Sequence, residues 1–235
     1  MALKVCSEDP PRMVLEKSPM KKTFQDRTSW YDGYLFEKIM EKRSREMFVD
    51  PISAFIEEGS SVLDIGCGTG SLVFNLSPVC STVVGIDISS KMIAYAKKRR
   101  EKKPYPNVEF HHLCASLLPE VFSDRFDYGV MGQVLHESSE ELRDAILAGA
   151  KKVATKLIIA DYRAPLPVNM YGVMISLVES IAGSEHNRNF KSWQANGGIY
   201  SFLMRHGLQV EEATPYRLGG KEIGIGTIVK VRYST

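Results

Sequence analysis

The sequence predicts an α/β protein built on a doubly wound sheet of seven strands, mostly parallel with an antiparallel last strand. Helices are expected on both faces, together with an N-terminal helical cap. Three observations support this class. Short apolar runs alternate with helical patterns through the middle of the 235 residues, which is typical of parallel strands joined by helices. A glycine-rich turn follows the first of these runs, at residues 66–70. The last two apolar runs are joined by a short connection over residues 218–222, which favours antiparallel pairing.

The first elements in chain order are a leader and a cap. Residues 1–22 contain several X-Pro pairs and are expected to form a flexible leader, whereas residues 23–58 carry apolar side chains at helical spacing and are expected to form the cap. Residues 59–235 are predicted to form one domain. Its strands are predicted at residues 61–65, 82–87, 108–112, 126–131, 156–160, 208–213 and 223–232, and its first three helices at residues 70–76, 89–102 and 138–153.

The alternating pattern changes after about residue 162. An insertion over about residues 165–206 is expected on the substrate side of the domain. It is predicted to contain a long apolar helix at residues 167–182, a polar loop, and a short helix that ends at Gly207, a favourable position for a C-terminal glycine. The apolar residues of the long helix could line a pocket, pack in the core or form a dimer face.

Composition excludes several classes of protein. The formal net charge is only +2, so composition gives no indication of nucleic-acid binding. The four cysteines show no paired spacing, which argues against a disulfide framework and fits a reducing cytoplasm. No apolar stretch is long enough to span a membrane. His111 and His112 have no partner at ligand spacing, so we expect no metal.

The glycine-rich turn and the acids around it predict a nucleotide-like ligand. In a parallel sheet the ligand crevice lies beyond the carboxyl ends of the strands, and glycines there let the backbone approach a ligand. Asp87 ends the second predicted strand, where a carboxylate can accept both hydroxyls of a ribose. Asp64 lies just before the turn and would repel a pyrophosphate but suit an ammonium group. Ser71 stands where a dinucleotide fingerprint has its third glycine, which disfavours a nicotinamide oxidoreductase.

Three segments resemble a known family. The stretch 62–70, VLDIGCGTG, resembles motif I of class I S-adenosylmethionine-dependent methyltransferases, and 84–93, VGIDISSKMI, resembles their second motif. Residues 126–137, with FDY and VLHE at their ends, look like the fourth-strand region. The similarity covers about residues 30–160 and is closest to the small-molecule branch, which includes quinone-biosynthesis methyltransferases.

The resemblance implies a Rossmann-like fold and S-adenosylmethionine as cofactor. It implies that Asp64, Gly66 and Gly68 hold the methionine portion and that Asp87 binds the ribose. The cofactor-binding residues predicted in this way are Asp64, Gly66, Cys67, Gly68, Asp87, Ile88, Met92, Cys114, Ala115, Gln133 and Tyr31.

The adenine end departs from the family pattern. By the resemblance, Ile88 or Met92 packs on adenine, and an acid after the third strand accepts a hydrogen bond from its amino group. Here Cys114 stands at the position of that acid, and a thiol is a poor acceptor. We therefore expect adenine to contact the backbone near Cys114 and Ala115, or Ser116.

His136 is the best candidate for a catalytic base. It follows the fourth predicted strand on the carboxyl side of the sheet, where the methyl group should project. The alternative is a structural histidine near the start of a helix. Methyl transfer from a sulfonium depends mainly on positioning and exclusion of water, and a base is needed only if the acceptor must lose a proton.

The acceptor is expected to contact the insertion and the cap. Residues 185–193 combine donors, acceptors and aromatics, which favours a substrate lid over a plain loop. The substrate-binding residues predicted here are His186, Arg188, Phe190 and Trp193. Tyr31 belongs to a Tyr-Asp pair that, by the resemblance, lies over the cofactor, where an aromatic face near a sulfonium is favourable.

The sequence therefore predicts a cytoplasmic S-adenosylmethionine-dependent methyltransferase that acts on a small, partly apolar molecule as a monomer or homodimer. The alternatives are an RNA or protein methyltransferase and a module that binds the cofactor without catalysis. The basic run at residues 97–103 ends a predicted helix, where cations suit the helix dipole, so nucleic-acid contact is disfavoured.

Overall fold

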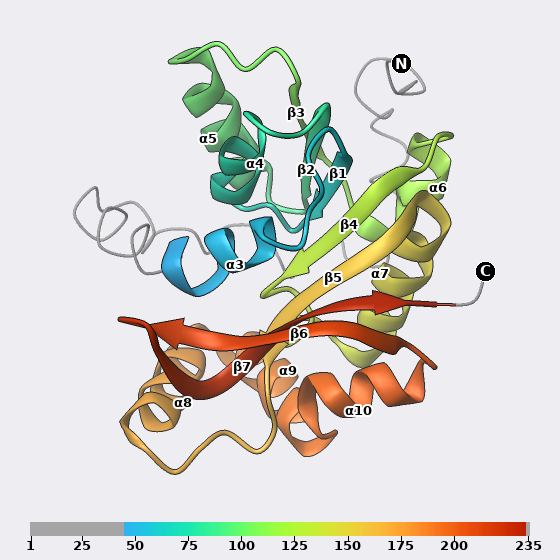
Figure 1. Ribbon diagram of the computed structural model, residues 1–235. Helices are drawn as coiled ribbons and strands as arrows, with labels where there is room; N and C mark the ends of the chain where they lie inside the picture. Colours follow the sequence, from blue (N-terminus) through green and yellow to red (C-terminus); the bar gives the residue numbers. More distant parts are fainter. Residues whose placement is uncertain (1–44, 234–235) are drawn as a thin grey trace.

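The computed structural model describes residues 45–233. The expected leader, the first part of the cap and Tyr31 lie outside this range, and the expectations about them stay predictions. The described residues form one seven-stranded sheet with helices packed around it (Figure 1). The strands are β1 (Ser61–Ile65), β2 (Thr82–Asp87), β3 (Val108–His112), β4 (Phe126–Gly132), β5 (Ala154–Tyr162), β6 (Gln209–Leu218) and β7 (Lys221–Arg232).

The strand order confirms the predicted fold class. The sheet runs β3-β2-β1-β4-β5-β7-β6, and the first five strands pair in parallel. Strand β7 is antiparallel to both β5 and β6, so it is the one described strand that runs against the others. The chain runs outward from β1 to β2 and β3 and then crosses back to β4 on the other side of β1, which creates the switch point where ligands bind in such sheets.

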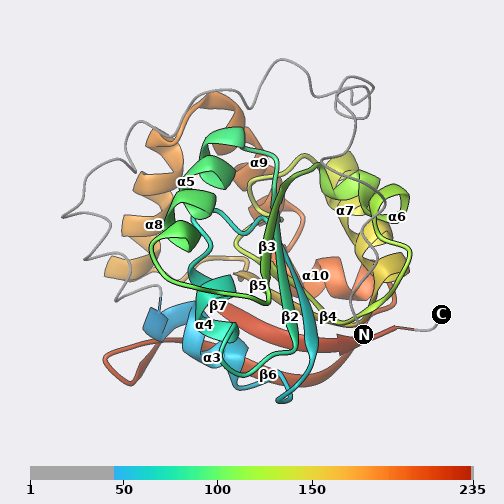
Figure 2. The ribbon, with the colours of Figure 1, turned by 90° about the horizontal axis from the view of Figure 1, so that it is seen from above.

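The helices cover both faces of the sheet. Figure 2 shows α4 and α5 on one face and α6 and α7 on the other. Helices α5 and α7 begin at serine caps: Ser89 Oγ accepts a hydrogen bond from Met92 N–H, and Ser139 Oγ accepts one from Leu142 N–H, each at 3.3 Å. The helical segments are η1 (Arg45–Val49), α3 (Asp50–Ser53), α4 (Ser71–Leu76), α5 (Ser90–Glu101), η2 (Ala115–Leu117), α6 (Leu118–Val121), α7 (Glu140–Val153), α8 (Met170–Ile181), α9 (Ser184–Ala195) and α10 (Gly198–Arg205).

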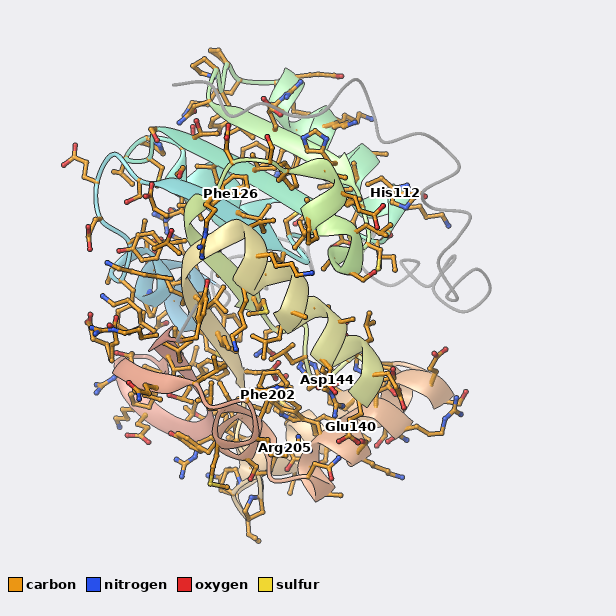
Figure 3. All side chains as sticks on the ribbon, turned by 90° about the vertical axis from the view of Figure 1, so that its right-hand side faces the viewer. His112, Phe126, Glu140, Asp144, Phe202 and Arg205 are labelled. Carbon is orange, nitrogen blue, oxygen red and sulfur yellow. The ribbon has the colours of Figure 1, made fainter. Side chains whose placement is uncertain are left out.

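Helix α7 is fixed to the C-terminal helices by a buried arginine and by surface ion pairs. The Arg143 side chain is fully buried; its Nε donates to Leu135 O and its Nη2 to Asn189 O, both at 2.7 Å. On the surface, Glu140 pairs with Arg205 of α10 at 3.0 Å, and both are labelled in Figure 3. The carbonyl of Leu135 lies just after β4, so Arg143 also ties the helix to the edge where the strands end.

The prediction of a polar loop after residue 182 is wrong. Residues 184–195 form helix α9, which begins directly after Gly183. Phe190 and Trp193 lie three residues apart and therefore share one helix face, which is buried against the sheet. Polar side chains cover the rest of this helix, which is why the segment has the composition of a loop.

Helix α8 is more exposed than a pocket wall or a core helix would be. Tyr171 and Ile175 pack against the core. The other large apolar side chains face outward in the part of the chain that the structure describes: Met170, Val173, Met174, Leu177, Val178 and Ile181. Within the described range, no helix combines the length and the apolar character that crossing a bilayer requires.

Candidate cofactor and acceptor site

A cavity of about 500 Å³ lies at the carboxyl ends of β1, β2, β3 and β4. This size is typical of small-molecule sites. Of the residues predicted to bind the cofactor, ten line it: Asp64, Gly66, Cys67, Gly68, Asp87, Ile88, Met92, Cys114, Ala115 and Gln133. Tyr31, the eleventh, lies outside the described residues. The strands thus bring together side chains that are far apart in the sequence.

The glycine-rich turn needs its glycines for conformation. Gly66, Gly68 and Gly70 all have positive φ, at 77°, 53° and 81°. The N–H groups of Gly66 and Cys67 both donate to Ile86 O, at 2.8 and 2.9 Å, which fixes the turn to the end of β2. A Cβ atom at Gly66 would overlap the side chain of Val134. The backbone of the turn therefore faces the cavity without side chains in the way.

Asp87 connects this turn to the start of α5. Its Oδ2 accepts a hydrogen bond from Gly68 N–H at 2.9 Å, and its Oδ1 accepts one from Ser89 N–H at 2.7 Å. Burial raises the pKa of the carboxyl, and the two backbone donors oppose that rise. A carboxylate has about four acceptor positions, so both oxygens keep capacity for hydroxyl donors in the cavity.

The Asp64 carboxylate costs more free energy to bury than the Asp87 carboxylate. It ends up 4% exposed, and among the described residues no side chain or backbone group donates a hydrogen bond to its carboxyl. Burial, together with the nearby Asp87, raises its pKa to about 7. A cation entering the cavity would offset this cost. The two carboxylates are acceptors, and they would fit the ammonium group of S-adenosylmethionine at Asp64 and its ribose hydroxyls at Asp87.

The end of the cavity that is predicted to hold adenine is apolar. Ile88, Met92 and Leu113 line it beside Cys114 and Ala115. The Cys114 Sγ lies 3.1 Å from Ser116 Oγ, so the thiol has a partner within its own loop. Cys67 is buried in the turn, and burial together with Asp64 and Asp87 raises its pKa well above the ordinary value, which leaves it an unreactive thiol.

Arg99 is a positioning residue that the sequence analysis did not identify. It extends from α5 and donates from Nη1 to Thr69 O at 3.0 Å, within the glycine-rich turn. Arg100, its neighbour, donates to Val108 O at 2.9 Å. Two members of the basic run at 97–103 therefore stabilise the fold of the chain itself. In the sequence, the whole run has the composition of a solvated helix end. Only the contacts in the folded chain show that these two arginines differ in role from the basic residues beside them.

Gln133 forms part of the cavity floor in a strained conformation. Its φ is 60°, an uncommon value for a residue other than glycine. Its backbone N–H donates to Ala160 O at 2.8 Å, and its side-chain Nε2 donates to Tyr216 Oη at 2.6 Å. These bonds on the β5 and β6 side hold the residue in place at the edge of the cavity, which it lines.

His136, the predicted catalytic base, does not line the cavity. Its side chain is 2% exposed, and its Nδ1 lies 2.8 Å from Asp161 Oδ1 at the end of β5. Burial alone would lower its pKa, but the carboxylates of Asp161, Glu137 and Glu179 together raise it to about 9. Its neighbours Glu137 and His186 do line the cavity, and the role of His136 as a catalytic base stays a prediction.

Of the four predicted substrate-binding residues, only His186 lines the cavity. Phe190 and Trp193 are buried in the core, and Trp193 donates from Nε1 to Tyr162 O at 3.0 Å. Arg188 is exposed on α9 and absent from the cavity lining. The helical form of residues 184–195 explains this outcome, because a helix presents only part of its surface to one site.

Several cavity residues were missing from the predicted site. They come from four places: the end of the cap, the glycine-rich turn with α4, the start of α7, and α9. The spacing of residues in a predicted helix shows which of them share a face. The sequence does not show which face lines the cavity, so these residues could not be identified from it. They are Phe48, Val49, Ile52, Thr69, Ser71, Leu72, Glu137, Ser138, Leu142, Ile146 and Glu185.

The family of the chain follows from comparison with known proteins. The methyltransferase domain family matches residues 56–209, which is more than half of the chain. The chain therefore belongs to this family. The motifs at residues 62–70 and 84–93 predicted the class of S-adenosylmethionine-dependent methyltransferases and this cofactor. Both predictions are confirmed.

Curated relatives match shorter segments. An uncharacterised methyltransferase of Schizosaccharomyces pombe is 34% identical over 117 residues, which cover 45% of this chain and 39% of that protein. Juvenile hormone acid O-methyltransferase of Drosophila melanogaster is 32% identical over 80 residues, 32% of this chain and 27% of that protein. Demethylmenaquinone methyltransferase of Chlorobaculum parvum is 36% identical over 70 residues, 29% of this chain and 26% of that protein. The chain thus aligns with well under half of the length of these relatives.

Solved structures share the fold over most of the chain. Magnesium protoporphyrin IX methyltransferase from Synechocystis PCC 6803, crystallised with S-adenosylhomocysteine, superposes with a TM-score of 0.59 at 19% identity, over 86% of this chain and 88% of that one. The mitomycin 7-O-methyltransferase has a TM-score of 0.60 at 15% identity, over 85% of this chain and 55% of that one. At such identities the likeness concerns the fold.

Proposed function

We propose that the protein transfers a methyl group from S-adenosylmethionine to a small, partly apolar acceptor that is neutral or cationic. The cavity carries this proposal. Beyond the two acids of the cofactor end, its wall combines apolar side chains of the cap and α7 with Glu137, Glu185 and His186. Carboxylates at this end would repel a phosphate or carboxylate acceptor.

In this proposal the chain contributes mainly positioning. Bound S-adenosylmethionine supplies an electrophilic methyl group on sulfur and leaves as S-adenosylhomocysteine. Asp64 would hold its ammonium and Asp87 its ribose hydroxyls, so the cofactor is anchored at two separate points. Phe48, Val49 and Ile52 would exclude water from the acceptor side, where the orientation of the two reactants accounts for most of the rate. An acceptor that must lose a proton would find Glu137 or His186 at this wall.

The alternative acceptors are less well supported. An RNA methyltransferase needs a basic surface near its site, but Arg99 and Arg100 of the basic run donate to backbone carbonyls of the chain. A module that binds the cofactor without catalysis would need no acceptor pocket beside it. The relatives named for a juvenile hormone acid and a demethylmenaquinone agree with a small, partly apolar acceptor, but the first of these acceptors is an acid, so the relatives do not support the charge proposed here.

The test uses S-adenosylmethionine labelled on its methyl group. The full-length protein is incubated with a metabolite extract and, separately, with RNA and protein fractions of the same cells. We expect label in a small molecule, detected by mass spectrometry, and none in macromolecules. Asp87→Asn should lose this labelling, whereas Asp127→Asn, at the opposite end of the sheet, should keep it. Label found only in RNA or protein, or in no fraction at all, would overturn the proposal.

A further inference from the structure

Two histidines and a glutamate meet at the inner wall of the cavity. One ligand atom from each of His136, Glu179 and His186 lies within 4.8 Å of the other two. They come from the loop after β4, from α8 and from the first turn of α9. Gly183 turns the chain between the two helices with a φ of 123°, which brings Glu179 and His186 together. Both His136 and Glu179 are buried, and His186 lines the cavity.

The buried environment leaves the outer nitrogen of His136 available. Its Nδ1 faces Asp161 Oδ1 at 2.8 Å. The Asp161 carboxylate already accepts hydrogen bonds from the N–H groups of Leu135, His136 and Tyr162, so it acts as the acceptor of the imidazole proton. In the neutral imidazole that a metal ion would bind, the Nε2 lone pair points away from Asp161. A carboxylate that orients an imidazole in this way is typical of histidines that bind metals.

The space in front of this nitrogen is wider than a hydrogen bond. The nearest carboxylate oxygens to His136 Nε2 belong to Glu137, at 3.8 Å, and to Glu179, at 3.9 Å. An ion with bonds of about 2.0–2.1 Å in a tetrahedral site separates its ligand atoms by roughly 3.3 Å. Binding of an ion would therefore bring His136 Nε2 and Glu179 closer together and separate Glu179 from His186, which are now in direct contact. Glu179 is itself held, since its Oε1 accepts from Tyr162 Oη at 3.3 Å and its Oε2 contacts His186 Nε2.

The charges of the cluster also favour a cation. Asp161, Glu179 and Glu137 place three carboxyl groups around two imidazoles, and the first two carboxyls are buried. Protons on both imidazoles are one way to balance these charges. A divalent ion is the other, and it would leave both imidazoles neutral as ligands. The mixture of nitrogen and oxygen donors suits zinc, whereas magnesium and calcium prefer oxygen alone.

We propose that His136, Glu179 and His186 bind a Zn²⁺ ion, with Asp161 as the positioning residue for His136 and a fourth ligand position open to the cavity. An ion there would polarise a heteroatom of the acceptor as a Lewis acid. The expectation of no metal considered only His111 and His112. Histidines on separate elements show no ligand spacing in the sequence. The proposal concerns metal binding, so it stands or falls separately from methyl transfer.

The experiment measures zinc directly. The full-length protein is treated with a chelator, dialysed and titrated with Zn²⁺ against a chromophoric competitor. We expect one ion per chain, and binding at least tenfold weaker in His186→Ala, Glu179→Gln and Asp161→Asn. His206→Ala is the matched control, because this imidazole pairs with Asp144 at 3.1 Å on the outside of the fold and should leave zinc binding unchanged. Replacement by Co²⁺ should give the visible absorption of a tetrahedral site.

Folding and cofactor binding are measured on the same samples. Variants that still bind S-adenosylhomocysteine in calorimetry are folded, so their loss of zinc reports on the site. No stoichiometric zinc in the native protein would overturn the proposal and identify the cluster as a proton-sharing network. Zinc binding that is unchanged in both His186→Ala and Glu179→Gln would overturn it as well. Either outcome leaves the cofactor site untouched, because Asp64 and Asp87 do not belong to the cluster.

Discussion

The two acids of the cofactor end are held differently, and this difference defines their roles. Asp87 accepts two backbone hydrogen bonds and so also stabilises the turn that contains Gly68. Asp64 accepts none from the described residues and carries the higher cost of burial. One acid is therefore fixed before the ligand arrives, whereas the other gains its partner only with the ligand.

Replacing Asp87 by Asn should weaken the binding of S-adenosylhomocysteine by about 1.5–3 kcal/mol, the value of hydrogen bonds to a charged group. Isothermal titration calorimetry measures the change. Asp127→Asn is the control, because Asp127 also accepts hydrogen bonds from a backbone N–H and a hydroxyl, both of Ser61, but at the opposite end of the sheet. Equal losses in the two variants would show that the effect is general and that Asp87 does not bind the ribose.

Asp64 should make cofactor binding depend on pH. Its pKa of about 7 in the ligand-free protein means that the carboxyl is protonated at pH 6. An ammonium group favours the carboxylate, so binding at pH 6 should release a proton, and the affinity should rise with pH until it levels off above 7. Calorimetry in buffers of different ionisation enthalpy measures the release. Asp64→Asn should bind the cofactor more weakly and without releasing a proton. If proton release persists in this variant, the proton comes from another group.

Among the elements, the glycine-rich turn depends on its first glycine for two separate reasons. Gly66→Ala should cost about 1–2 kcal/mol for the left-handed backbone and about 1–3 kcal/mol more for overlap with Val134. Gly59→Ala tests the first effect alone, since its φ is 80° and no atom lies within 4 Å of the added carbon. Urea unfolding gives both free energies. If the two variants lose the same free energy of unfolding, the overlap with Val134 does not contribute, and the second reason given for Gly66 is wrong.

Arg143 should contribute more stability than any surface arginine of the same helix pair. Arg143→Met removes the donors of Leu135 O and Asn189 O, and each orphaned carbonyl costs about 1–3 kcal/mol. Arg205→Met breaks only the surface pair with Glu140, worth about 0.2–1 kcal/mol. The free energies of unfolding of the two variants, measured in urea, give the comparison. A loss for Arg143→Met within the surface range would mean that water replaces its bonds.

The elements differ in how well the sequence predicts them. The strands and the turn at 66–70 were predictable, because buried parallel strands are continuous apolar runs and positive φ strongly favours glycine. Helix α9 was not, because its polar residues outnumber the two aromatics, Phe190 and Trp193, that fix it to the core. Its buried face is visible only as a spacing of three residues, which is too short a pattern to separate a helix from a loop.

At the scale of the whole molecule, the residues predicted to bind the cofactor lie together at one cavity, whereas most of those predicted to bind the acceptor do not. The cofactor residues follow directly after strands, so the order of strands in the sheet places them. The cluster around His136 is assembled from β5, α8 and α9, through contacts that no local pattern encodes. Asp161 illustrates this: it ends a buried strand like its apolar neighbours, and its role depends on a histidine from another loop.

The fold also bears a cost for its site, and this cost should be visible in the stability of the whole chain. Because folding raises the pKa of Asp64 to about 7, the ligand-free protein should lose stability as the pH rises from about 4 through 7. Asp64→Asn carries no charge to bury, so it should melt higher than the native protein at pH 8 and at nearly the same temperature at pH 5. Melting followed by circular dichroism measures both differences. Saturating S-adenosylhomocysteine should raise the native melting point more than that of the variant at pH 8, because only the native carboxylate gains the ammonium partner. If Asp64→Asn melts lower than the native protein at pH 8, the buried carboxylate has a partner in the folded chain, and its part in cofactor binding would have to be reassigned.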